Sequence, residues 1–402
     1  LFAGLRKSSR TFLVSNYLVT LLLNQRNKPY TNTLAIIMKK RLLTIILLIF
    51  TIQFFAQSDE GKIVNYKFNS ESFGNERKLK IFLPIEYELE PNMKFPVIYL
   101  LDAQNESLFN LTKSTIDYLI GSNELQPSIL VGIISEDRQF EFLSENENEE
   151  TSNRYKKVGG SINLMNSLKN EVFSYIDKNY RVRPNRIGIG HSLGGTFLTE
   201  TLINNPTLFN GLILISPNYA YDNEQIIQYI DKISTNIKSN DNYVYSISGS
   251  IGALENEFNP VTKKIDSLFK LKKLKSTQWS YREIENYNHG TILLEGIHKG
   301  LIDYSNNFDL SKINNNGYEQ LSVNNFEKAF EIFQRGIDLF PNDSNIYDSF
   351  AEAKEKSGNL KEAKKLYLIA LKNLKKEKKK YKEKEFLRRE KIYKENIKRV
   401  SN

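Results

Sequence analysis

A glycine-rich turn between an apolar strand and a helical segment constrains this chain more than any other part of its sequence. Residues 186–195 read RIGIGHSLGG, and the pattern G-x-S-x-G within them is typical of a serine on a sharp strand-to-helix turn. Glycines flank the serine because a side chain there would collide with the adjoining strand or helix. The helix N-terminus would point N–H groups at a carbonyl that gains negative charge. The pattern predicts a nucleophile at Ser192; a tight turn with an inert serine is the alternative.

Composition excludes several kinds of site. The chain has 402 residues, enough for two domains and a sizeable core. It contains no cysteine and three histidines. Disulfides, thiolate-bound metals, cysteine nucleophiles and lipid anchoring through an N-terminal cysteine are therefore excluded. We expect neither a metal ion nor a cofactor.

The net charge of +9 is concentrated at the two ends of the chain. Residues 1–56 carry +8 and residues 375–402 carry +8, which leaves −7 for residues 57–374. A nucleic-acid-binding domain carries its basic residues on the folded body itself. We therefore expect no nucleic-acid partner.

The basic N-terminal region has the layout of a secretory signal peptide. Met38 opens the stretch MKKR, which is followed by the apolar residues 42–55 and by Ala56 before a polar segment. The apolar run is shorter than the roughly 20 residues of a membrane span. We expect a signal peptide from Met38 to Ala56, cleavage after Ala56, and a periplasmic or secreted protein without a stable membrane span. Residues 1–37 are then upstream sequence from a wrong start; a genuine extension with an apolar segment near residues 12–23 is the alternative.

Apolar strands alternate with helical segments between residues 57 and 308. The apolar runs lie at residues 97–101, 129–134, 187–189, 212–215 and 243–247. Residues 62–84 indicate an antiparallel entry into the sheet, and residues 164–179 indicate a helix with apolar side chains four apart. This pattern predicts an α/β domain with a mostly parallel sheet covered by helices on both faces. Reactive groups on such a sheet lie at the carboxyl ends of its strands.

Residues 309–378 differ from the preceding domain because they contain a 34-residue period. Asn325, Ala329, Ile332, Phe333 and Phe340 recur as Asn359, Ala363, Leu366, Tyr367 and Leu374. This spacing is typical of tetratricopeptide repeats, in which small residues lie where helices cross and aromatic residues pack between them. We expect a small all-α region of two repeats that could bind a protein or peptide partner. An ordinary helical hairpin is the alternative.

The last segment, residues 379–402, is rich in Lys and Glu with sparse apolar positions. This composition predicts a solvated or capping helix. A basic arm for anionic surfaces is the alternative.

A serine nucleophile needs a base, and His289 is the best candidate. In α/β proteins with this turn, the order along the chain is serine, carboxylate, histidine. Two histidines, His289 and His298, follow Ser192. His289 lies in the polar loop of residues 286–291 after a strand-like segment, whereas His298 lies inside an amphipathic helix. We therefore assign the base to His289, which would take the proton of the Ser192 hydroxyl.

The carboxylate that orients the base should follow the strand at residues 243–247. The next loop contains Glu255 and Glu257. We prefer Glu255; Glu257, or a serine–histidine pair without a carboxylate, is the alternative.

An oxyanion hole needs two N–H donors. One should be Leu193, the residue after the nucleophile. The other should come from the loop after the strand at residues 97–101, near Ala103 or Gln104.

Several segments together resemble the putative-esterase group of α/β-hydrolases, which contains enterochelin esterases, trilactone-siderophore esterases and esterase D-like enzymes. The matching segments are FPVIYLLD at 95–102, VGI at 131–133, NYRV at 179–182, GHSLGG at 190–195, NPTLFN at 205–210 and ISP at 215–217. The resemblance spans about residues 62–300. It implies the α/β-hydrolase fold, an ester substrate, Ser192 as nucleophile and His289 as base.

Two segments depart from the group's pattern where substrate would be contacted. They are residues 137–142 and residues 219–221, which read YAY. We expect Asp102, Arg138, His191, Tyr219 and Tyr221 to line the substrate site. The sequence thus predicts an exported serine esterase of the siderophore-esterase type. A feruloyl or acetyl polysaccharide esterase, and an inactive hydrolase scaffold that binds a protein through its repeats, are the alternatives.

Overall fold

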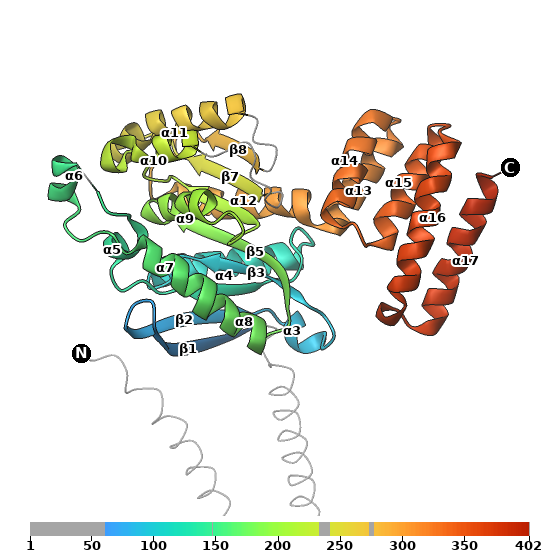
Figure 1. Cartoon of the computed structure of the whole chain (residues 1–402), viewed down its shortest axis with the longest axis horizontal. Coiled ribbons are helices and arrows are strands. Elements are labelled where there is room, and N and C mark those ends of the chain that lie inside the picture. Colours follow the sequence, from blue (N-terminus) through green and yellow to red (C-terminus); the bar gives the residue numbers. More distant parts are fainter. Residues whose placement is uncertain (1–60, 147, 233–241, 273–276, 402) are drawn as a thin grey trace, which may run out of the picture. The chain divides into compact units, whose positions relative to one another are not determined.

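An eight-stranded mixed sheet forms the centre of the N-terminal domain (Figure 1). The computed structural model describes residues 61–146, 148–232, 242–272 and 277–401. The expected signal peptide and the upstream residues lie outside this part of the chain. The strands are β1 Lys62–Ser70, β2 Asn75–Leu83, β3 Phe95–Leu100, β4 Ile129–Ile133, β5 Val182–His191, β6 Gly211–Ile215, β7 Asn242–Ser248 and β8 Thr277–Glu283. Their spatial order is β1-β2-β4-β3-β5-β6-β7-β8.

The sheet is parallel from β4 to β8, and β1 and β2 enter it antiparallel. The helices of this domain are α3 Glu86–Leu89, α4 Glu106–Gly121, α5 Arg138–Phe142, α6 Glu149–Arg154, α7 Ser161–Ser167, α8 Phe173–Asn179, α9 Leu193–Asn204, α10 Tyr221–Lys232, α11 Ala253–Lys272 and α12 Ile292–Phe308. The five predicted apolar runs coincide with β3 to β7. The predicted α/β-hydrolase fold is confirmed. The helix expected at residues 164–179 is divided by a π-helical segment, Leu168–Val172.

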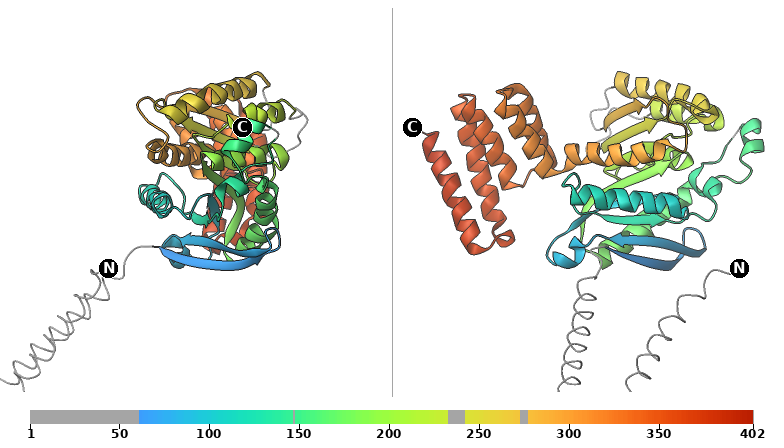
Figure 2. Two further views of the ribbon diagram at one scale, coloured as in Figure 1. Left: turned by 90° about the vertical axis from the view of Figure 1, so that its left-hand side faces the viewer. Right: turned by 180° about the vertical axis from the view of Figure 1, so that it is seen from behind.

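Both faces of the sheet are buried, which explains why its strands are continuously apolar. Side chains of successive strand residues point to opposite faces: Ile98 packs with α4 and α12, whereas Val97 packs with α7, α8 and α9. Figure 1 shows α7, α8 and α9 in front of the sheet, and the right-hand view of Figure 2 shows α4 and α12 on the opposite face. The two layers leave the carboxyl ends of the strands to carry the site.

Helix α9 buries a carboxyl group in this core. Glu200 is 4% exposed, and its Oε1 accepts a hydrogen bond of 3.1 Å from Ser144 Oγ. Burial raises the pKa of Glu200 from its ordinary 4.5 to about 7. The neutral carboxyl is therefore the form that the fold accommodates.

Replacement of Glu200 by Gln should remove a pH-dependent loss of stability. The pKa of Glu200 is higher in the folded state than in the unfolded chain. The contribution of the neutral carboxyl to the free energy of unfolding is therefore fully present below pH 4.5 and is lost as the pH rises through about 7. We expect Glu200→Gln to gain about 3 kcal/mol in free energy of unfolding relative to the unmodified chain between pH 4 and pH 9. Urea unfolding at a series of pH values measures this. The exposed Glu149→Gln is the control, and parallel pH curves for Glu200→Gln and the unmodified chain would contradict the prediction.

The C-terminal region consists of two helical hairpins and a final helix. The helices are α13 Leu310–Ser322, α14 Phe326–Leu339, α15 Ser344–Lys356, α16 Leu360–Lys376 and α17 Glu383–Arg399. Helices α13 and α15 begin 34 residues apart, at Leu310 and Ser344, as do α14 and α16. A Cβ atom at Gly317 would lie 2.5 Å from the Phe333 ring, so this crossing requires glycine. The geometry has the predicted period; the assignment to tetratricopeptide repeats stays a prediction.

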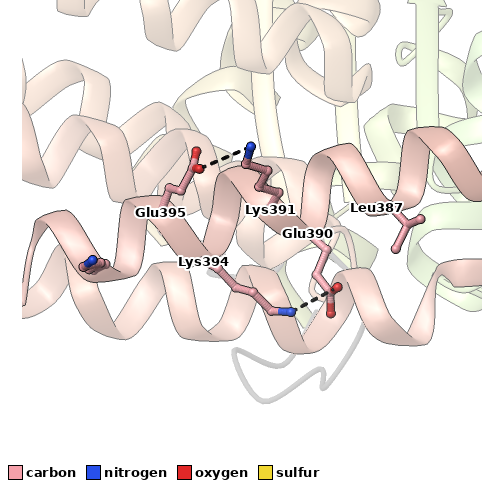
Figure 3. A pocket seen from close by; sticks show the side chains of 6 residues that line it. Leu387, Glu390, Lys391, Lys394 and Glu395 are labelled. Atoms are coloured by element: carbon pink, nitrogen blue, oxygen red, sulfur yellow. Dashed lines mark ion pairs between the residues drawn. The ribbon is translucent and has the colours of Figure 1, made fainter.

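Helix α17 caps this region. Phe386 and Tyr393 on its inner face pack in one apolar cluster with Ala370 and Leu374 of α16. On its outer face, Lys391 pairs with Glu395 at 3.9 Å and Lys394 with Glu390 at 3.1 Å (Figure 3). With the pair of Arg389 and Glu385 at 3.2 Å, six of its charges are paired within the helix, which favours the capping interpretation over a basic arm. Within the described ranges, no helix has both the length and the hydropathy to span a bilayer.

Candidate active site

The turn between β5 and α9 holds Ser192 in a strained backbone conformation. Its φ is 57° and its ψ is −119°. Residues other than glycine rarely adopt this backbone conformation. The Ser192 N–H donates to the carbonyl of Ile215 in β6 at 2.9 Å, which fixes the turn to the next strand. A Cβ atom at Gly190 would lie 2.5 Å from the carbonyl carbon of Gly194. Glycine at this position therefore allows the close approach that the sequence pattern indicated.

Two groups at this turn are available for chemistry. Ser192 is half-buried, and its hydroxyl has no hydrogen-bond partner among the residues that the structure describes. Leu193 is the first residue of α9, and no acceptor for its N–H lies in the described part of the chain. The first N–H groups of a helix lack partners within the helix and attract negative charge. The predicted oxyanion donor Leu193 is thus placed beside Ser192.

His289 and Glu255 form a hydrogen-bonded pair across two loops. The Nδ1 atom of His289 lies 2.9 Å from Oε1 of Glu255. The carboxyl side chain is fully buried, whereas the imidazole is 17% exposed. The Phe258 ring packs edge-on against the imidazole at 5.5 Å between centroids. An ionised carboxylate can only accept hydrogen bonds, so the Nδ1 atom of His289 carries the proton. The Nε2 atom is then unprotonated and can accept a proton.

The two alternatives for the acid and the base lie elsewhere. Glu257 faces outward from α11 and pairs with Arg154 at 2.5 Å. His298 lies within α12, at a partly exposed position. The structure therefore joins His289 to Glu255, the pair preferred from the sequence.

Of the two candidates for the second oxyanion donor, Ala103 is excluded by the structure. The Ala103 N–H donates to the carbonyl of Ile133 at 3.0 Å, because the end of β3 runs beside β4 in the parallel register. Ala103 is also completely buried. The neighbouring Gln104 N–H has no hydrogen-bond partner among the described residues and remains the candidate in this loop.

A charged pair lies beside the same turn. Asp102 is 6% exposed and has a φ of 61°. Arg138 binds both of its oxygens, through Nε at 3.0 Å and Nη2 at 2.9 Å. Gln104 Nε2 donates a third hydrogen bond of 2.8 Å. Asp102 Oδ2 lies 3.7 Å from where a Cβ atom of Gly194 would be, so the pair adjoins the start of α9.

The two tyrosines expected to contact substrate point into the core instead. Tyr219 is fully buried, and its hydroxyl lies 2.7 Å from Thr199 Oγ1. Tyr221 is 5% exposed and donates to the Ser144 carbonyl at 2.7 Å. Both side chains join the apolar layer below α9. With Thr196 and Asn218 they line a small cavity within the domain, and they expose almost no surface to solvent.

Asn218 lies next to the nucleophile, although the sequence analysis did not single it out. Its N–H donates to the Ser192 carbonyl at 3.3 Å, and its own carbonyl accepts from Thr196 Oγ1 at 2.9 Å. Its side chain donates to Tyr155. The one sequence signal is its place just after the carboxyl end of β6.

The described residues contain no group of three or more His, Asp or Glu side chains arranged to hold a metal ion. His191, also expected to contact substrate, lies against His289: its Nε2 is 2.9 Å from the His289 carbonyl oxygen.

Comparisons with known proteins identify a family and related proteins. The family described as Putative esterase matches residues 70–300. YjcH of Bacillus subtilis, an uncharacterized protein, is 25% identical over 203 residues, which cover 49% of this chain and 75% of YjcH. Ferri-bacillibactin esterase BesA of the same organism is 26% identical over 195 residues, which cover 44% of this chain and 66% of BesA.

A solved structure shares the fold. The IroE-like serine hydrolase from Shewanella oneidensis superposes with a TM-score of 0.58 at 15% identity, over 77% of this chain and 99% of that chain. The family match spans more than half of the sequence and contains Ser192, Glu255 and His289. This chain therefore belongs to the Putative esterase family.

Proposed function

We propose that this esterase-family protein hydrolyses carboxylic esters through an acyl-enzyme on Ser192. The observation that carries the proposal is the His289–Glu255 hydrogen bond of 2.9 Å next to the strained turn of Ser192. A serine on such a turn, a histidine and a buried carboxylate are the three parts of a serine hydrolase site.

In the first half-reaction, Ser192 Oγ attacks the ester carbonyl while Nε2 of His289 takes the hydroxyl proton. The carbonyl oxygen becomes an oxyanion, which the Leu193 N–H and an N–H of the 102–104 loop stabilise. The C–O bond to the leaving group then breaks, and His289 returns the proton to the departing alcohol. The buried Glu255 carboxylate keeps the proton of His289 on Nδ1 and stabilises the imidazolium.

In the second half-reaction, water attacks the acyl carbonyl as His289 Nε2 takes a proton from it. The bond to Ser192 Oγ breaks, the proton passes to that oxygen, and a carboxylic acid leaves. The two half-reactions together consume one ester and one water and release one alcohol and one carboxylic acid. No proton acceptor besides His289 is required.

The substrate class is a siderophore ester. This part of the proposal depends on the likeness to a ferri-bacillibactin esterase over 195 residues. A feruloyl or acetyl polysaccharide ester would use the same catalytic groups, so direct comparison of a catecholate trilactone with a feruloyl ester separates the two.

Labelling with a fluorophosphonate tests the mechanism. The purified chain should gain one covalent adduct on Ser192 and should hydrolyse p-nitrophenyl acetate, and Ser192→Ala should do neither. The variant Ser174→Ala, at an exposed position of α8, is the matched control and should behave like the unmodified chain. A folded chain that is neither labelled nor active would favour an inactive scaffold.

A further inference from the structure

His191 connects the nucleophile to the base. It is the last residue of β5 and directly precedes Ser192. Its Nε2 lies 2.9 Å from the backbone carbonyl oxygen of His289, and the two rings pack at 4.4 Å between centroids. The His289 carbonyl has no other hydrogen-bond partner among the described residues. The side chain next to the nucleophile therefore contacts the main chain of the base.

The chemistry of this contact fixes the state of His191. A carbonyl oxygen only accepts, so His191 Nε2 carries the proton. Burial, and then the facing His289, lower the pKa of His191 to about 3. The ring is thus neutral at every working pH, with Nε2–H as its donor. A neutral ring at this place does not oppose the positive charge that His289 gains when it takes the serine proton.

We propose that His191 is a positioning residue that holds the His289 main chain beside Ser192. The inference depends on the proposed hydrolase function, because proton transfer from Ser192 to His289 requires the two residues to lie close together. Glu255 fixes the His289 ring at Nδ1, and His191 fixes the backbone that carries the ring. The two contacts act on different parts of His289, because the hydrogen bond at Nδ1 orients the ring and the one at the carbonyl sets the distance of the main chain from β5.

The loop around His289 supports this role. Asn288 Oδ1 accepts from the N–H groups of Gly290 and Thr291, each at 3.0 Å, which shapes the turn itself. The Tyr287 carbonyl accepts from Ser250 and Ile251, which attaches the turn to the acid-bearing loop. Among the hydrogen bonds of the described residues, the contact with His191 joins this turn to β5 and hence to the nucleophile.

Two substitutions separate the donor from the ring. The amide nitrogen of His191→Gln can occupy the place of Nε2 and donate, whereas His191→Phe keeps the ring and loses the donor. A misplacement of about 1 Å can cost about 100-fold in rate. We therefore expect His191→Phe to lower kcat for p-nitrophenyl acetate about 10- to 100-fold at unchanged KM. His191→Gln should recover kcat to within about threefold, and His298→Phe is the control outside the site.

The rate of fluorophosphonate labelling of Ser192 provides the second measurement and should fall in parallel with kcat. A His191→Phe variant with unchanged kcat would overturn the inference. So would an equal loss in His191→Gln and His191→Phe at unchanged melting temperature, or a change confined to KM, which would indicate a substrate contact. If the unmodified chain is neither labelled nor active, the proposed function fails and this inference falls with it.

Discussion

Replacement of Glu255 by Gln should lower kcat for p-nitrophenyl esters about 10³- to 10⁴-fold. In the serine-protease triad, exchange of the orienting carboxylate for an amide costs about 10⁴-fold. Glu255 is fully buried and lies 2.9 Å from His289 Nδ1. An amide cannot stabilise the imidazolium, and its NH₂ group can hold the wrong tautomer. We expect KM to change little, because Glu255 contacts His289 rather than the ester.

The neighbouring carboxylate provides a matched control. Glu257 lies two residues further along α11, where it pairs with Arg154 and is 36% exposed. Glu257→Gln should keep kcat and KM within about twofold, since exposed ion pairs contribute about 0–1 kcal/mol. Steady-state kinetics and melting temperatures of both variants check the prediction. A loss below tenfold in Glu255→Gln would show that His289 works without a carboxylate partner.

Local sequence patterns were sufficient to select Ser192 and His289 as the candidate nucleophile and base. The turn at Ser192 is built from contiguous residues, so its glycines and its flanking strand and helix can be read directly. His289 followed from chain order and from its polar loop. The choice between Glu255 and Glu257 is different. Both glutamates stand in the first turns of one helix, and only the packing of α11 on the sheet determines which one is buried.

The errors at Ala103, Tyr219 and Tyr221 have a common physical cause. Each depends on a partner distant in the sequence. The Ala103 N–H is occupied because β4 places the Ile133 carbonyl opposite it. The tyrosines are buried because α9 and the Ser144 segment provide partners for their hydroxyls. Strand register and layer packing decide such contacts, and the local pattern of residues does not contain either.

The Asp102–Arg138 pair shows how a charge near the oxyanion site can be tolerated. The developing oxyanion would lie by Leu193 at the start of α9, and the Asp102 carboxylate adjoins Gly194 in the same turn. A free carboxylate there would oppose the negative charge of the transition state. The bidentate contact with Arg138, at 2.9 and 3.0 Å, neutralises it.

Loss of Arg138 should therefore be severe and should be repaired by loss of Asp102. We expect Arg138→Ala to lower kcat/KM about 10²- to 10³-fold, because Asp102 would then keep only the hydrogen bond from Gln104 and its charge would oppose the oxyanion. Asp102→Asn in the Arg138→Ala background should restore most of the activity, because no uncompensated charge then remains. Arg154→Ala, which breaks an exposed pair, is the control. Kinetics of the unmodified chain, Arg138→Ala, Asp102→Asn and the double variant form a double-mutant cycle. If the double variant were no better than Arg138→Ala, Arg138 would act on the substrate itself rather than on Asp102.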